Sequence, residues 1–163
     1  DMKRHDNTDD YEEYIKKLEE NGIPNAREKI ENMYILDFII MNEDRHLNNF
    51  GIIRDVNTLK WLDVAPIFDN GMALNIPYYD ENEVIISGNG RFFYEVKPFD
   101  EMIQVVGNIK RIDISKLDDI PECFDNLLHE YQHITHISDK RIYGLCVILQ
   151  RQINKLKKII EEA

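Results

Sequence analysis

"ILDFIIMNEDRHLNNFGII", residues 35–53, decides the fold, because it joins a strongly apolar segment directly to a run of polar residues. Residues 33–41 are apolar or aromatic at every position except Asp37. A helix that is apolar on nearly all sides is typical of the centre of a protein, and Pro24 suits its first position. The sequence therefore predicts a buried helix from Pro24 to about Met41 that leads straight into a polar loop.

A β-hairpin is expected directly after this loop. Residues 50–55 and 59–68 have strand-like composition and are separated by a turn at 56–58. Because the two arms of a hairpin pair, the polar loop and Asp69, at the far end of the second arm, should lie close together. Residues 70–98 contain several glycines and prolines and are expected to form a long irregular loop, which in a small domain is usually functional.

The remaining segments read as helices. They cover an acidic stretch before Gly22, then about 99–106 and 121–134, and a long last helix from residue 139 with Ser138 as its cap. The expected fold is mainly α with one small β-hairpin, an α+β domain. At 163 residues and 43% hydrophobic composition, the chain 1–163 reads as a single globular domain.

The net charge of −11 excludes some classes of partner. A chain this acidic should be repelled by nucleic acids and by anionic membranes, so direct binding to either is not expected. No apolar run reaches the length of a membrane span, and two cysteines do not make a disulfide framework. We therefore expect a cytoplasmic protein.

Three polar residues have the spacing of a phosphoryl-transfer site. Such a reaction needs a divalent cation to neutralise phosphate charge and a group that accepts the proton of the attacking hydroxyl. Asp44 and Asn49 have the Asp-x4-Asn spacing of a kinase catalytic loop, and Asp69 ends the hairpin that follows. Carboxylate and amide oxygens are ligands that suit Mg²⁺.

The segments "ILDFIIMNEDRHLNNFGII" and "VAPIFDNG" resemble the C-terminal lobe of HipA-like serine/threonine kinases, the bacterial toxin kinases. The "DRH..N" part is also similar to the catalytic loop of phosphatidylinositol 3/4-kinases. The resemblance implies that Asp44 is the catalytic base, that Asn49 and Asp69 bind Mg²⁺ and through it ATP, and that His46 orients the loop. It further implies a protein substrate, phosphorylated on Ser or Thr, and an antitoxin partner.

The resemblance also divides the chain into parts. It implies a catalytic loop at 42–50, a metal-site hairpin at 50–71, an activation-segment-like loop at 70–98 and C-terminal helices at 99–163. One departure is large, because a kinase carries a glycine-rich loop and a lysine before its catalytic loop. The 43 residues before Asp44 read instead as two helices, and the glycines of "SGNGRFF", residues 87–93, follow the metal aspartate.

This departure leaves two hypotheses open. In the first, the chain is the C-lobe of an active kinase whose N-lobe is encoded upstream or on a separate chain. In the second, the N-lobe is lost and the chain is a catalytically incomplete kinase-fold module that binds or regulates.

A rival motif, "HEYQH" at 129–133, matches the H-E-x-x-H pattern of zinc proteases, with His136 as a third possible ligand. The helical period argues against this reading. It groups the apolar residues of 124–134 on one side and the histidines on the other, so the histidines should face solvent. A catalytic zinc needs a sheltered cavity, so we do not favour a protease.

Overall fold

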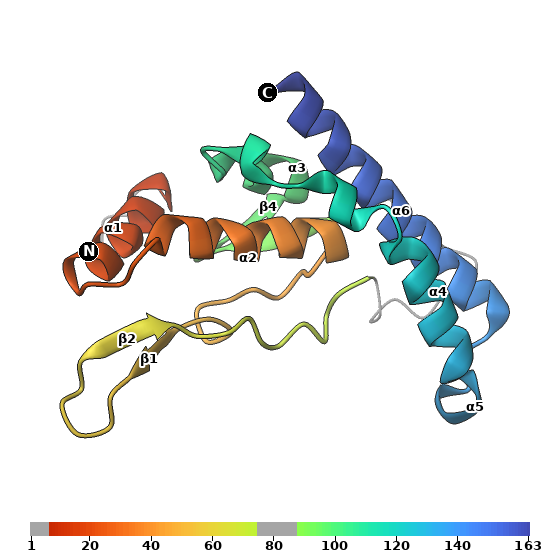
Figure 1. Ribbon diagram of the computed structural model, residues 1–163, viewed down its shortest axis with the longest axis horizontal. Coiled ribbons are helices and arrows are strands. Elements are labelled where there is room, and N and C mark those ends of the chain that lie inside the picture. Colours follow the sequence, from red (N-terminus) through yellow and green to blue (C-terminus); the bar gives the residue numbers. More distant parts are fainter. Residues whose placement is uncertain (1–6, 75–87) are drawn as a thin grey trace.

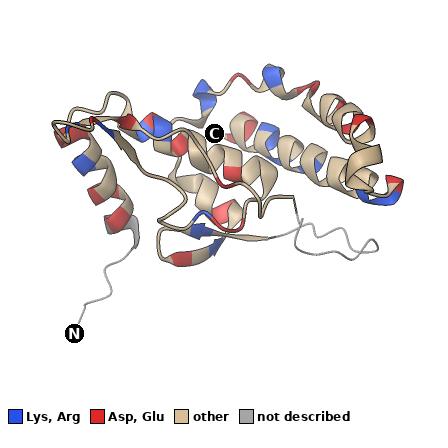
Figure 2. Ribbon diagram, turned by 90° about the horizontal axis from the view of Figure 1, so that it is seen from below, with Lys and Arg blue, Asp and Glu red and all other residues tan. Residues whose placement is uncertain are grey.

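The computed structural model describes residues 7–74 and 88–163, and Figure 1 shows the arrangement of its elements. The chain is mainly helical with two small antiparallel hairpins, as expected for an α+β domain. Part of the predicted 70–98 loop, residues 75–87, lies outside the described residues. Figure 2 shows that Lys and Arg are scattered over many elements and do not gather on one of them. No helix in the described ranges is both long and apolar enough to cross a membrane.

Helix α2 (Ala26–Ile40) is the centre of the molecule and confirms the predicted buried helix. It contacts α1 (Asn7–Glu20), α3 (Phe99–Met102) and α6 (Asp139–Glu162), which surround it in Figure 1. Tyr34 and Phe38 are each 1% exposed. The helix begins two residues after Pro24 because Asn25, at its N-cap, is in the left-handed conformation with a φ of 53°.

The predicted hairpin is present but shorter than expected. Strands β1 (Ile52–Arg54) and β2 (Trp61–Val64) pair antiparallel, with Ile52 opposite Val64. Asp55 stabilises the turn, because its carboxylate accepts hydrogen bonds from the backbone of Asn57 and from both the backbone and the hydroxyl of Thr58. Residues 65–70 continue from β2 without strand structure, so the second arm reaches Asp69 as an extended loop.

A second hairpin corrects the prediction that residues 70–98 are irregular. Strands β3 (Asn89–Phe92) and β4 (Glu95–Pro98) pair antiparallel. Gly90 does not break the chain here but permits a close contact: a Cβ there would lie 2.7 Å from both Met102 Sδ and Phe99 Cε1. A glycine within a strand often marks such a close approach.

The C-terminal part is helical, as predicted, but it is divided into more and shorter helices than expected. After α3 come three short 3-10 helices, then two helices that replace the single one expected at 121–134, and finally α6: η1 (Ile103–Val105), η2 (Ile109–Arg111), η3 (Ile114–Leu117), α4 (Ile120–Glu130), α5 (Gln132–Thr135) and α6 (Asp139–Glu162). Ser138 caps α6 by accepting a hydrogen bond from the backbone N–H of Arg141. Helix α4 packs along α6, and α6 buries its apolar stripe against α2.

Candidate functional site

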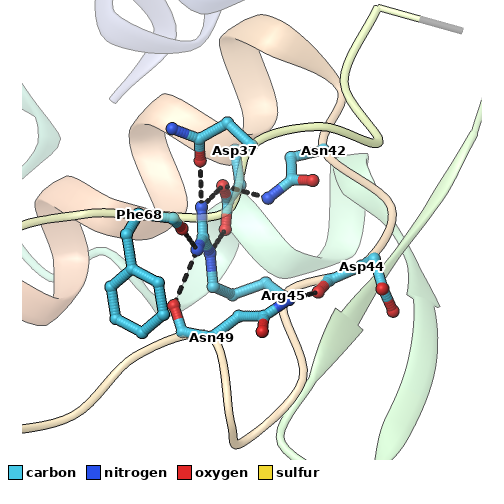
Figure 3. A network of polar contacts seen from close by, with 7 residues as sticks. Asp37, Asn42, Asp44, Arg45, Asn49 and Phe68 are labelled. Carbon is cyan, nitrogen blue, oxygen red and sulfur yellow. Dashed lines mark hydrogen bonds and ion pairs between the residues drawn. The ribbon is translucent and has the colours of Figure 1, made fainter. Parts of the chain in front are cut away.

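The buried guanidinium of Arg45 organises the polar loop (Figure 3). Its Nε and Nη2 donate to the two carboxylate oxygens of Asp37 at 2.9 and 2.8 Å. Its Nη1 donates to the carbonyl oxygens of Asn49 and Phe68 at 2.8 and 2.5 Å. Its Nη2 also donates to Asn70 Oδ1 at 2.5 Å. We call these residues, together with Asn42, which donates to Asp37 Oδ1, the Arg45 network.

Burial explains why the Arg45 network is so completely paired. The side chains of Arg45 and Asp37 are both 0% exposed. A charge removed from water is tolerated only when an opposite charge and further hydrogen bonds replace its hydration. Asp37, the one charged residue in the apolar part of α2, therefore has its cation eight residues later in the sequence. Sequence reasoning placed Asp37 in the buried helix and did not identify its partner.

The Arg45 network joins two segments that are distant in sequence. Arg45 follows Asp44 directly, and it holds the backbone of Phe68 and the side chain of Asn70, which flank Asp69. The predicted proximity of the polar loop and the end of the second hairpin arm is therefore confirmed. Asp69 itself is exposed, with a φ of 55°. No hydrogen bond or ion pair joins its carboxylate to another residue of the described ranges.

Asn49 is buried, at 4% exposed, and has a fixed orientation. Its Nδ2 donates to the backbone carbonyl of Asp44 at 2.8 Å, which closes the loop on itself. Because the amide nitrogen is used in this way, Oδ1 is the end of the side chain that can bind a cation. The loop thus carries an oriented amide oxygen and a carboxylate whose positions depend on each other.

The carboxylate of Asp44 is partly exposed and lies between two nitrogen groups. Arg91 Nε is 3.2 Å from its Oδ1, and His46 Nε2 is 3.8 Å from its Oδ2. The other ring nitrogen of His46, Nδ1, accepts a hydrogen bond from the backbone N–H of Asn48 at 3.2 Å. An Nδ1 that accepts leaves the proton of the neutral ring on Nε2, the nitrogen that faces Asp44.

The residues present fit a Mg²⁺ site of the open kind. In residues 7–74 and 88–163, no three His, Cys, Asp or Glu side chains come together as a closed metal cage. Mg²⁺ at a phosphoryl-transfer site does not need one, because it takes one or two protein oxygens and fills its other positions with phosphates and water. Suitable oxygens are Asn49 Oδ1 and the carboxylate of Asp69, which has no partner among the described residues.

The histidines of "HEYQH" do not form a comparable cluster. His129, His133 and His136 are all exposed. Helix α4 ends at Glu130 and α5 begins at Gln132, so His129 and His133 do not lie on one continuous helix. The apolar side of this segment is also more open than its period predicts, since Leu127 is 50% and Ile134 63% exposed.

Sequence reasoning missed two arginines at the site, Arg45 and Arg91. A signal for Arg45 was available, because a buried Asp37 requires a cation close by and the polar loop supplies only one arginine. No comparable signal existed for Arg91, which reaches Asp44 only through the unpredicted β3–β4 hairpin.

Comparison with protein-family models, with curated proteins and with solved structures found no match to this chain. The function has to be inferred from the chemistry of the site.

Proposed function

We propose that this chain is the C-terminal catalytic lobe of a HipA-like serine/threonine protein kinase, which transfers the γ-phosphoryl group of ATP to a protein hydroxyl. The observation that supports this proposal is the Arg45 network. It ties the loop that carries Asp44 and Asn49 to the segment that carries Asp69. A candidate base and two candidate Mg²⁺ ligands thereby lie on two segments that the Arg45 network joins.

Each group has a separate chemical task in this proposal. Asn49 Oδ1 and the Asp69 carboxylate hold Mg²⁺, which neutralises charge on the ATP phosphates. Asp44 accepts the proton of the attacking hydroxyl. His46, whose Nδ1 accepts from the backbone N–H of Asn48 and whose Nε2 lies 3.8 Å from Asp44 Oδ2, orients the loop. The toxin role and the antitoxin partner rest on the resemblance alone, whereas the cytoplasmic location is proposed from the cysteine content and the apolar runs of the sequence.

The alternative, a binding or regulatory module without catalysis, is favoured by one observation. In the described residues before Asp44 there is no glycine-rich strand-turn-strand, because these residues form the helices α1 (Asn7–Glu20) and α2 (Ala26–Ile40), joined by a short connection. The lysine and the loop that cover the phosphates in kinases would have to come from another segment or chain.

Calorimetric titration of the chain with ATP, with and without Mg²⁺, tests the proposal. We expect binding that requires Mg²⁺ and that is lost in Asp69→Ala. Asp118→Ala is the matched control, because it removes an equally charged, exposed carboxylate that pairs with Lys157 on α6. ATP binding that does not need Mg²⁺, or that survives Asp69→Ala unchanged, would show that the metal assignment is wrong.

A further inference from the structure

The ion pair between Arg91 and Asp44 carries an inference about the same site. Arg91 Nε lies 3.2 Å from Asp44 Oδ1, and the two side chains are 44% and 37% exposed. An ion pair this open to solvent contributes little to stability, and its members can exchange partners when a ligand binds. The pair therefore adds little to the stability of the fold, and we consider what it does at the site.

The β3–β4 hairpin gives Arg91 a defined position. Its neighbours in the strand, Gly90 and Phe92, are both buried, while Arg91 points to the opposite side. Gly90 is pressed against Phe99 and Met102, and Phe92 packs on the rings of Tyr11 and Tyr34 at centroid distances of 5.7 and 5.2 Å. The backbone of Arg91 is thus held from both sides, and its side chain extends from a defined position on the strand.

The two arginines of the site differ in their unused donors. A guanidinium has five N–H groups. Arg45 uses all three of its nitrogens inside the protein, on Asp37, Asn49, Phe68 and Asn70. Arg91 Nε pairs with Asp44, and in the described part of the chain no hydrogen bond from its two Nη groups is found.

We propose that Arg91 is a phosphoryl-binding residue, whose Nη groups bind the γ-phosphate of a nucleoside triphosphate while its Nε holds Asp44. This inference rests on the proposed function. Guanidinium and phosphate match in geometry as well as in charge, because two parallel N–H groups can reach two oxygens. Without such a cation, the carboxylate of Asp44 would repel the phosphate that it must approach.

In the proposed phosphoryl transfer, Arg91 takes no part in the making or breaking of covalent bonds. The bond between the γ-phosphorus and the bridging oxygen of ADP breaks, and a bond between that phosphorus and the substrate hydroxyl oxygen forms. The hydroxyl proton goes to Asp44, and ADP leaves with the electron pair of the broken bond. Arg91 keeps its protons and follows the negative charge of the transferred group.

Binding of Mg²⁺-ATP and Mg²⁺-ADP to the full 163-residue chain tests the inference, because only ATP has a γ-phosphate. We expect Arg91→Gln to weaken ATP binding about tenfold or more, the worth of a charge-assisted hydrogen bond, and to leave ADP binding unchanged. Arg91→Lys keeps the charge but loses the paired N–H groups, so its affinity for ATP should lie between those of the unchanged chain and Arg91→Gln. Arg54→Gln is the control, since Arg54 is exposed on β1 and lies over the ring of Trp61. Far-UV circular dichroism checks that each variant is folded.

The outcomes separate the inference from the proposed function. If binding of both nucleotides is lost in Asp69→Ala but Arg91→Gln binds ATP as the unchanged chain does, the inference is overturned and the function stands. If Arg91→Gln binds ATP more tightly, the pairing of Arg91 with Asp44 hinders nucleotide binding, and the inference is again overturned. If the unchanged chain binds neither nucleotide, the inference, which places γ-phosphate binding on this chain, is overturned. The proposed function is then tested by the same titration with the chain joined to an N-lobe.

Discussion

Replacing Asp37 by Asn removes one charge from the buried pair and keeps the shape of the side chain. The resulting amide presents an N–H group to a guanidinium that has only N–H groups, so two hydrogen-bond donors face each other. Arg45 remains buried at 0% exposure and loses its counter-ion. The carbonyl groups of Asn49 and Phe68 stay in place but cannot compensate for a full charge.

The expected loss of stability is large. Breaking a buried pair by removing one partner costs about 3–5 kcal/mol. A domain of this size has a total stability of roughly 5–15 kcal/mol, so Asp37→Asn should bring the protein close to unfolding. The same substitution at Asp63, whose pair with Lys29 is 45% and 31% exposed, should cost less than about 1 kcal/mol.

Urea denaturation measures both variants. Far-UV circular dichroism reports on the helices, and the fluorescence of Trp61, the one tryptophan of the sequence, reports on the first hairpin. The two probes should give coincident transitions, and the midpoint should shift far more for Asp37→Asn than for Asp63→Asn. Equal shifts for the two variants would refute the assigned role of the buried pair.

Three further predictions concern the catalytic base, the second hairpin and the response to pH. Asp44→Asn should keep Mg²⁺-dependent ATP binding but reduce phosphoryl transfer at least about a hundredfold, measured with the chain joined to an N-lobe; transfer at the unchanged rate would exclude Asp44 as base. Gly90→Ala should cost about 1–3 kcal/mol in urea denaturation, because its Cβ would lie 2.7 Å from two buried side chains, whereas Gly51→Ala, where a Cβ meets nothing within 4 Å, should change stability little; equal effects would contradict the packing argument. Burial raises the pKa of Tyr11 to about 12, so the stability that its neutral hydroxyl contributes is complete below about pH 10 and is lost as the pH rises towards 12. Unfolding measured across that range should show a shallower decline in Tyr11→Phe, and an identical decline would exclude Tyr11 as a cause.

The sequence predicted the parts of the fold that local patterns determine. The apolar run at 33–41 has no stable place except the interior, so α2 and the burial of Asp37 could be inferred. The turn at 56–58 is set by the side chain of Asp55 on the next residues, which is again a local effect. The proximity of the two polar segments followed from strand pairing.

The parts that failed depend on contacts between distant residues. Gly90 looks like a breaker unless one knows that Phe99 and Met102 lie against it, so the second hairpin was missed. The sequence could have linked Arg45 to the buried Asp37, but it carries no local signal for the acceptors at Phe68 and Asn70, which are 23 and 25 residues away. Asp44, Asn49 and Asp69 could be named as a set, but the residue that unites them could not.

The Arg45 network also has a consequence for the order of events during synthesis. When residues up to Asn49 have left the ribosome, Arg45 can already pair with Asp37, but two of its acceptors have not yet been made. Until residue 70 emerges, the guanidinium must keep some of its hydration, and the loop cannot close completely. The first helices can therefore collapse early, whereas the polar loop reaches its final form only after the hairpin has been translated and has folded back. A nascent chain whose emerged part ends just before residue 68 would lack two acceptors of Arg45, and its polar loop would still be open.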